Sequence, residues 1–142
     1  MQPVNKMKTE FLSKSANEAF ARVVAASFVA QADPSIDILA DIRTAVSEAV
    51  TNSVIHGYEE KDGVITMECI LFQDYVEIII EDFGKGISDI ERAKTPLYTS
   101  RPDLERSGMG FTVMETFMDS LEVDSVPGRG TKIRMTKQLV YR

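Results

Sequence analysis

The segment 82–86, with the sequence Asp-Phe-Gly-Lys-Gly, constrains this chain more than any other stretch. It directly follows a run of β-branched and aromatic residues, 75–81, which predicts a buried strand. An acidic residue at a strand end, followed by glycines at alternate positions, predicts a tight turn where the backbone can approach a flat or charged ligand. The same pattern also marks plain turns, so a turn without a ligand is the alternative.

A second glycine signal lies at 107–110, where the sequence is Ser-Gly-Met-Gly, before a predicted short helix at 111–118. Glycines before a helix leave free backbone N–H groups at the positive end of the helix dipole, which is a site for an anion. The segment is not a Walker A loop, because no Gly-Lys-Ser/Thr follows at the required spacing.

The two glycine signals bracket a polar segment, 87–106, which contains several prolines, serines and basic residues. A connection of this length in a compact domain is usually functional or disordered. Glycines on both sides suit the hinges of a lid, and its basic side chains would suit a polyphosphate. An ordinary mobile loop with scattered charges is the alternative.

A helix is predicted at about 36–55, after the chain break and cap at Asp33-Pro34-Ser35. Glu48 and Asn52 are four residues apart, so they share one side of this helix, near the edge of its apolar stripe. A carboxylate there can act as a base, and an amide oxygen can ligate a hard cation such as Mg²⁺. A solvated glutamate and a surface asparagine are the alternative.

An earlier helix is predicted from a capping box at 15–18 to about Gln31. Helical spacing predicts a core face made of Phe20, Val23, Val24, Ser27 and Phe28. The opposite face has small apolar residues around one arginine and therefore suggests a protein interface. Its members are Arg22, Ala25, Ala26 and Val29. Alanines chosen for helix propensity are the alternative.

Strands are predicted at 6–12, 64–72, 75–81, 121–126 and 131–140. The second and third form a hairpin through a short turn, and a glycine-rich turn joins the last two.

The 142 residues predict one domain, 1–142, and the net charge of -6 argues against a general nucleic-acid binder and against anionic membranes. The single cysteine, Cys69, is expected to be a small core residue, which fits a reducing cytosol. We expect no signal peptide and no membrane span, hence a cytoplasmic protein. The only histidine, His56, cannot form a multi-histidine metal site.

In order and spacing, four segments resemble the sequence boxes of the GHKL ATPases, which include gyrase, Hsp90, histidine kinases and MutL. Residues 48–52 look like the N box, 82–86 the G1 box, 107–110 the G2 box and 128–131 the G3 element. One such box is a weak signal, whereas four in this order are a strong one.

Within that superfamily the chain is similar to the anti-sigma factor serine kinases, and in particular to the anti-sigma F factors of endospore-forming bacteria. The stretches 46–52 and 104–111 carry this similarity, which extends back through 17–22. The general-stress anti-sigma factor is the second candidate, because 104–111 fits it less well. A histidine kinase would need a helical domain with a phosphoacceptor histidine.

The resemblance implies an α+β fold, a two-layer α/β sandwich of the GHKL type. A mixed, mostly antiparallel sheet would carry helices on one face, and ATP would lie between the helix layer and a lid at about 87–107. By position, Glu48 would be the base for a serine hydroxyl, and Asn52 would hold Mg²⁺. Asp82 would accept the adenine amino group. The other ATP-binding residues would be Gly84, Gly86, Arg106, Ser107, Gly108, Gly110 and Thr131.

The resemblance also implies partners. A homodimer would hold a sigma factor, and an anti-anti-sigma protein would compete for the same face and be phosphorylated on a serine. Arg22 is the candidate for partner contact. Two rival functions stay open: a binding module that uses ATP without phosphate transfer, and a fragment of an ATPase or histidine kinase.

Overall fold

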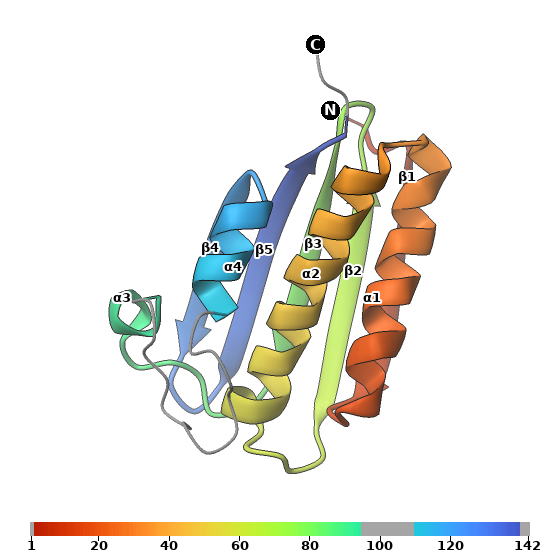
Figure 1. Cartoon of the computed structure of the whole chain (residues 1–142). Coiled ribbons are helices and arrows are strands. Elements are labelled where there is room, and N and C mark those ends of the chain that lie inside the picture. Colours follow the sequence, from red (N-terminus) through yellow and green to blue (C-terminus); the bar gives the residue numbers. More distant parts are fainter. Residues whose placement is uncertain (1, 95–109, 140–142) are drawn as a thin grey trace.

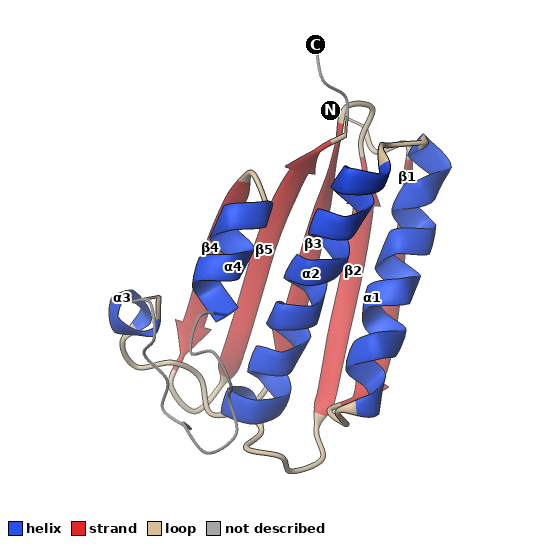
Figure 2. Cartoon of the chain, viewed as in Figure 1, coloured by secondary structure: helices blue, strands red, loops and turns tan. Residues whose placement is uncertain are grey.

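The computed structural model describes residues 2–94 and 110–139, and in these ranges three long helices lie over one face of a five-stranded sheet (Figure 1). Figure 2 shows the helix layer in front of the strand layer. The elements are β1 (Asn5–Leu12), α1 (Ala16–Val29), α2 (Ile36–Asn52), β2 (Val64–Leu71), β3 (Tyr75–Asp82), α3 (Ile90–Ala93), α4 (Gly110–Phe117), β4 (Ser120–Val126) and β5 (Gly130–Gln138). The predicted two-layer α+β fold is confirmed.

The sheet has the strand order β1-β2-β3-β5-β4, and all four pairings are antiparallel. The predicted sheet was mixed, but the described strands contain no parallel pair. Alternate residues of β2 and β3 are buried under the helices, which is the period of two that predicted them. Among these residues Cys69 is fully buried, as expected for a core residue, and burial raises the pKa of its thiol to about 12.

Helix α2 lies in the middle of the helix layer, between α1 and α4 (Figure 1). Its predicted stripe is confirmed, because each member is at most 1% exposed: Ile38, Ile42, Ala45, Val46, Ala49, Val50 and Ser53. The hydroxyl of Ser35 caps its start by accepting from the N–H of Ile38 at 3.3 Å. A π-helical turn, Ser53–Gly57, extends its far end.

The predicted core face of α1 was wrong in part: Val24 and Phe28 pack against the core, as expected, but the fully buried residues lie elsewhere on the helix. Ala21, Ala25 and Val29 are fully buried, whereas Phe20 and Val23 are 50% and 57% exposed. The small side chains face inward because they let α1 approach α2 closely, and the larger ones then lie at the rim. The predicted capping box is also absent, since Ser15 makes no side-chain cap bond and Glu18 pairs instead with Arg22 at 3.3 Å.

Lys137, on β5, joins the sheet to two helices beneath the surface. It is 8% exposed, and its Nζ donates to Oδ2 of Asp41 on α2 at 3.1 Å and to the carbonyl of Phe117 at 2.7 Å. The lysine therefore holds the C-terminal end of α4 against α2 and β5. The N-terminal end of the same helix begins at Gly110, one of the predicted site residues. None of the helices in the described ranges is long and apolar enough to span a membrane.

Candidate functional site

Four of the predicted segments meet at one end of the molecule. The C-terminal end of α2, the end of β3 and the start of β5 lie at the lower end of Figure 1, and α4 begins at the end of that helix nearer to them. Asp82 is the direct pairing partner of Thr131, although the two residues are far apart in the sequence. Arg106, Ser107 and Gly108 lie outside the described residues, so only Gly110 represents the second glycine signal here.

The carboxylate of Asp82 is the most unusual group at this end. The residue is 1% exposed, and Oδ1 accepts from the N–H of Gly84 at 3.0 Å. Oδ2 is buried and has no hydrogen-bond partner among the described residues. Burial raises the pKa of Asp82, against the opposing effects of the Gly84 N–H and the Ser53 hydroxyl. A buried acceptor without a partner is costly, so this oxygen is suited to a ligand that brings a donor.

Glycines surround this carboxylate because the backbone comes too close for side chains. A Cβ on Gly57 would lie 2.9 Å from both carboxylate oxygens of Asp82. A Cβ on Gly84 would lie 2.1 Å from the carbonyl oxygen of Gly57, and a Cβ on Gly130 would lie 2.1 Å from that of Asp82. Gly86 adopts a φ of 76°, in the left-handed region that favours glycine. Nothing local in the sequence around Gly57 indicates its contact with Asp82.

Thr131 is also buried, and a serine that the sequence analysis missed connects it to the neighbouring loop. Oγ of Ser125 lies 2.9 Å from Oγ1 of Thr131, donates to the carbonyl of Gly130 at 3.0 Å and accepts from the N–H of Ile87 at 2.6 Å. The segment that leaves Gly86 is therefore tied to the start of β5. Ser125 belongs to an alternating strand, and a strand serine carries no local signal for this role.

Glu48 and Asn52 lie on α2 one turn apart, and both are partly buried. Glu48 also borders a groove of about 490 Å³ between α1 and α2. The groove is lined by Arg22, Val23, Ala40, Arg43, Thr44, Ser47 and Glu48. Arg22 thus lies on an exposed helix face, as predicted, but Ala25 and Val29 of the proposed interface face belong to the core.

A cation at this end would need ligands beyond acidic or imidazole side chains. No cluster of three or more His, Cys, Asp or Glu residues that could hold a metal occurs within the described ranges. Mg²⁺ is commonly held by one or two protein oxygens together with substrate phosphates. The side-chain oxygen of Asn52 fits that kind of site.

The chain is similar to known proteins over nearly its whole length. A family model described as "Histidine kinase-like ATPase domain" matches residues 11–137. Among solved structures, that of the RsbU and RsbW domains of a Mycobacterium tuberculosis protein superposes with a TM-score of 0.71. The superposition covers 99% of this chain and 34% of the Mycobacterium tuberculosis chain, at 18% sequence identity. This similarity therefore supports the fold alone.

Curated relatives match over nearly their full length. The anti-sigma F factor of Clostridium novyi is 61% identical over 136 residues, which are 95% of each chain. The anti-sigma F factor of Clostridium beijerinckii is 65% identical over 135 residues, 94% of each chain. The anti-sigma F factor of a Thermoanaerobacter species is 58% identical over 139 residues, 98% of this chain and 97% of the relative. The family match implies a domain that binds ATP, and with these relatives it shows that the chain belongs to the GHKL ATPase superfamily and, within it, to the anti-sigma F factor family.

Proposed function

We propose that the chain holds the sporulation sigma factor sigma F and, as an ATP-dependent serine kinase, phosphorylates the anti-anti-sigma protein. One observation carries the proposal. The buried carboxylate of Asp82 has an oxygen with no partner among the described residues, and it lies where β3, β5 and the end of α2 meet. The identities of 57–65% to anti-sigma F factors support the choice of partners.

In this proposal Asp82 selects adenine. Its free Oδ2 accepts a hydrogen bond from the amino group of adenine, whereas guanine would place a carbonyl oxygen against it. Thr131 lies directly opposite Asp82 and completes the wall of the base site. Gly84 and Gly86 keep the turn close to the base.

The phosphates would extend from there toward α4. Gly110 begins that helix, and its first turn presents backbone N–H groups to an anion. Gly108, Ser107 and Arg106 remain proposed phosphate contacts on the basis of sequence. The side-chain oxygen of Asn52 would hold Mg²⁺, which neutralises phosphate charge when it is bound.

Glu48 would act as the general base of the transfer. Its carboxylate takes the proton of the acceptor serine, and the serine oxygen attacks the γ-phosphorus of ATP. The bond from that phosphorus to the bridging oxygen breaks, so ADP leaves and phosphoserine remains. Such transfer depends mainly on positioning and charge stabilisation, and a base at the edge of an open groove is accessible to a protein substrate.

The α1–α2 groove is the proposed docking surface for the acceptor protein. Val23 is a large apolar side chain that remains 57% exposed on α1, and it lines the groove beside the cationic side chains of Arg22 and Arg43. Exposed apolar residues next to arginines are typical of protein interfaces. Because Glu48 borders the same groove, a partner seated there would bring its serine to the base. The sigma factor would compete for this face, and the protein would act as a homodimer.

Arg22→Glu is expected to abolish acceptor and sigma-factor binding while leaving ATP affinity unchanged. The substitution places like charges at Glu18 and position 22, which costs α1 only about 0.2–0.5 kcal/mol. Binding is measured by calorimetry with each partner and with ATP. Lys6→Glu, an equal charge reversal on β1, is the control. Equal loss of partner and ATP binding would mean that the helix had unfolded.

The proposed activity is tested by transfer of labelled γ-phosphate from Mg-ATP to the anti-anti-sigma protein, with a serine-to-alanine acceptor as control. Transfer that requires the serine, and a product stable to acid, would support the kinase. An acid-labile product would indicate phosphohistidine instead. ATP-dependent complex formation without any transfer would leave a nucleotide-gated binding module.

A further inference from the structure

Tyr58, which follows the π-helical turn after α2, joins the two strand ends that flank Asp82. Its hydroxyl donates to the carbonyl of Val64, the first residue of β2, at 2.5 Å. The same oxygen accepts from the N–H of Phe83 at 2.8 Å. Ile65 and Asp82 are direct pairing partners, so the hydroxyl bridges the open end of this hairpin immediately beside the Asp82 carboxylate.

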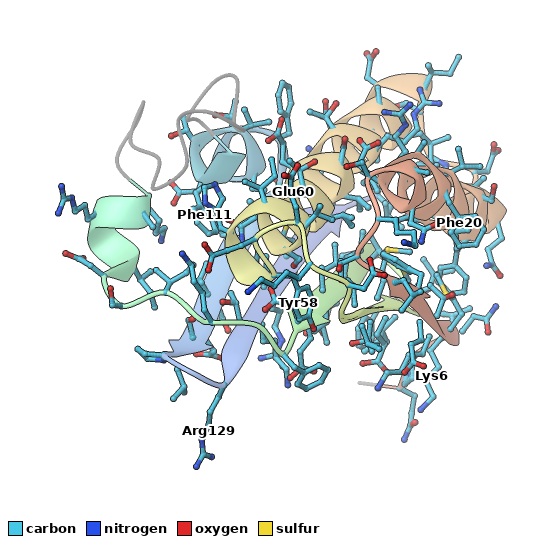
Figure 3. The ribbon with its side chains drawn as sticks, turned by 90° about the horizontal axis from the view of Figure 1, so that it is seen from below. Lys6, Phe20, Tyr58, Glu60, Phe111 and Arg129 are labelled. Atoms are coloured by element: carbon cyan, nitrogen blue, oxygen red, sulfur yellow. The ribbon has the colours of Figure 1, made fainter. Side chains whose placement is uncertain are left out.

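The ring of Tyr58 has space in this position only because residue 63 is glycine. A Cβ on Gly63 would lie 2.3–2.5 Å from three atoms of the ring. The hydroxyl of Ser13 accepts from the Gly63 N–H at 2.9 Å and so fixes the position of Gly63 next to the ring. Figure 3 shows Tyr58 between the end of α2 and the strand layer. The ring is therefore partly buried and packs against the core at this point.

The segment 53–58 contacts both Asp82 and the turn that follows it. Gly57 packs against the carboxylate itself, and its carbonyl accepts from the N–H of Lys85 at 2.9 Å. The Tyr58 N–H donates to the carbonyl of Ser53 at 2.9 Å, which closes the π-helical turn. Turns of this kind often occur at functional sites. The end of α2 is thereby connected both to Asp82, the last residue of β3, and to the turn that follows it.

Only a neutral phenol can make both hydroxyl bonds, because a phenolate has no proton to donate. Burial, and secondarily the negative charge of Asp82, raise the pKa of Tyr58, while the Phe83 N–H opposes the shift. The hydroxyl therefore stays protonated at neutral pH and keeps both partners.

We propose that Tyr58 is a positioning residue for adenine recognition, which fixes the backbone at 82–84 so that Oδ2 of Asp82 points at the base. The inference rests on the proposed adenine contact of Asp82. If the Phe83 N–H loses its acceptor, the turn at 82–84 gains freedom, and the direction of the carboxylate is no longer fixed. The phosphate end of the site would lie on α4, and neither partner of the Tyr58 hydroxyl, Val64 or Phe83, belongs to that helix.

Tyr58→Phe keeps the ring and removes only the hydroxyl. We expect ATP affinity to fall about tenfold, the size of losing one or two neutral hydrogen bonds. The affinity for inorganic tripolyphosphate, which has no base, stays unchanged, and so does the weak affinity for GTP. The preference for ATP over GTP therefore falls by the same factor. Calorimetry measures all three ligands, and thermal unfolding confirms that the variant is folded.

Tyr75→Phe is the matched control, since Tyr75 lies at the other end of β3 and stacks on Phe72 with the ring centroids 4.6 Å apart. It should change neither ATP affinity nor the preference. An equal loss for ATP, GTP and tripolyphosphate in Tyr58→Phe would overturn the inference, because it would indicate a general structural role. Unchanged ATP affinity would overturn it as well. A wild-type protein without preference for adenine would refute the proposed role of Asp82 instead.

Discussion

Glu48→Gln will lower the rate of phosphate transfer to the anti-anti-sigma protein by about 10²–10⁴-fold, the usual contribution of a general base. The amide has nearly the same shape but cannot take the serine proton. Because the charge is lost at a partly buried position of α2, the fold is retained. ATP-dependent binding of the acceptor and of the sigma factor should therefore persist. The measurement is a single-turnover assay with labelled ATP, run beside a binding titration.

Glu68→Gln provides the control for this experiment. Glu68 belongs to β2, where its neighbours Met67 and Cys69 are buried, so its side chain points to the face of the sheet away from the helices. The Glu68→Gln variant should transfer phosphate at the wild-type rate. If Glu48→Gln transfers phosphate at the wild-type rate, Glu48 is not the base. If Glu48→Gln loses ATP-dependent binding as well as phosphate transfer, Glu48 serves the nucleotide or partner site in another way.

Asp82→Asn is expected to reduce ATP affinity by about 10–100-fold, the effect of losing a hydrogen bond to a charged group. Its amide can still accept from Gly84 through Oδ1, but it presents an N–H at the position of the free Oδ2. A donor would then face the amino group of adenine. Calorimetry with ATP gives the loss, and tripolyphosphate should bind as before. Wild-type affinity for ATP in the variant would contradict the proposed adenine contact.

The same substitution is expected to raise the free energy of unfolding of the protein without nucleotide. Burial raises the pKa of Asp82 in the folded state, so the ionised carboxylate destabilises the fold at pH values above that folded pKa. The penalty shrinks as the pH falls through the folded pKa toward the ordinary value of an aspartate, about 4. The stability advantage of Asp82→Asn should shrink over the same interval.

Thermal unfolding of both proteins between neutral and acidic pH measures this difference. If the difference in stability between the two proteins widened on acidification, the predicted direction of the pH dependence would be wrong. A variant less stable than the wild type at neutral pH would show that the ionised carboxylate does not destabilise the fold. If Asp82→Asn gains stability and loses ATP affinity, the Asp82 carboxylate is a group that is maintained for function at the expense of stability.

Local patterns were sufficient for much of the fold. The stripe of α2 and the alternation in β2 and β3 were predicted from periodicity, and the structure buries the residues that the patterns selected. Both patterns are strong because polar and apolar residues separate cleanly. On α1 they do not separate, since both faces are apolar. The choice between Phe20 and Ala21 was made by how closely α1 packs against α2.

For the site, the sequence by itself determined which chemical groups are available and in what order: a carboxylate and an amide one turn apart on a helix, a second carboxylate at a strand end, and glycines after that strand. These follow from the order of residue types along the chain. The tertiary structure alone decided that Gly57 would touch Asp82, that Tyr58 would bridge β2 and Phe83, and that Ser125 would join Ile87 to β5. The physical reason is that each of these links contains a contact between residues 25 or 38 positions apart, across strand ends whose meeting depends on the sheet order and not on local periodicity.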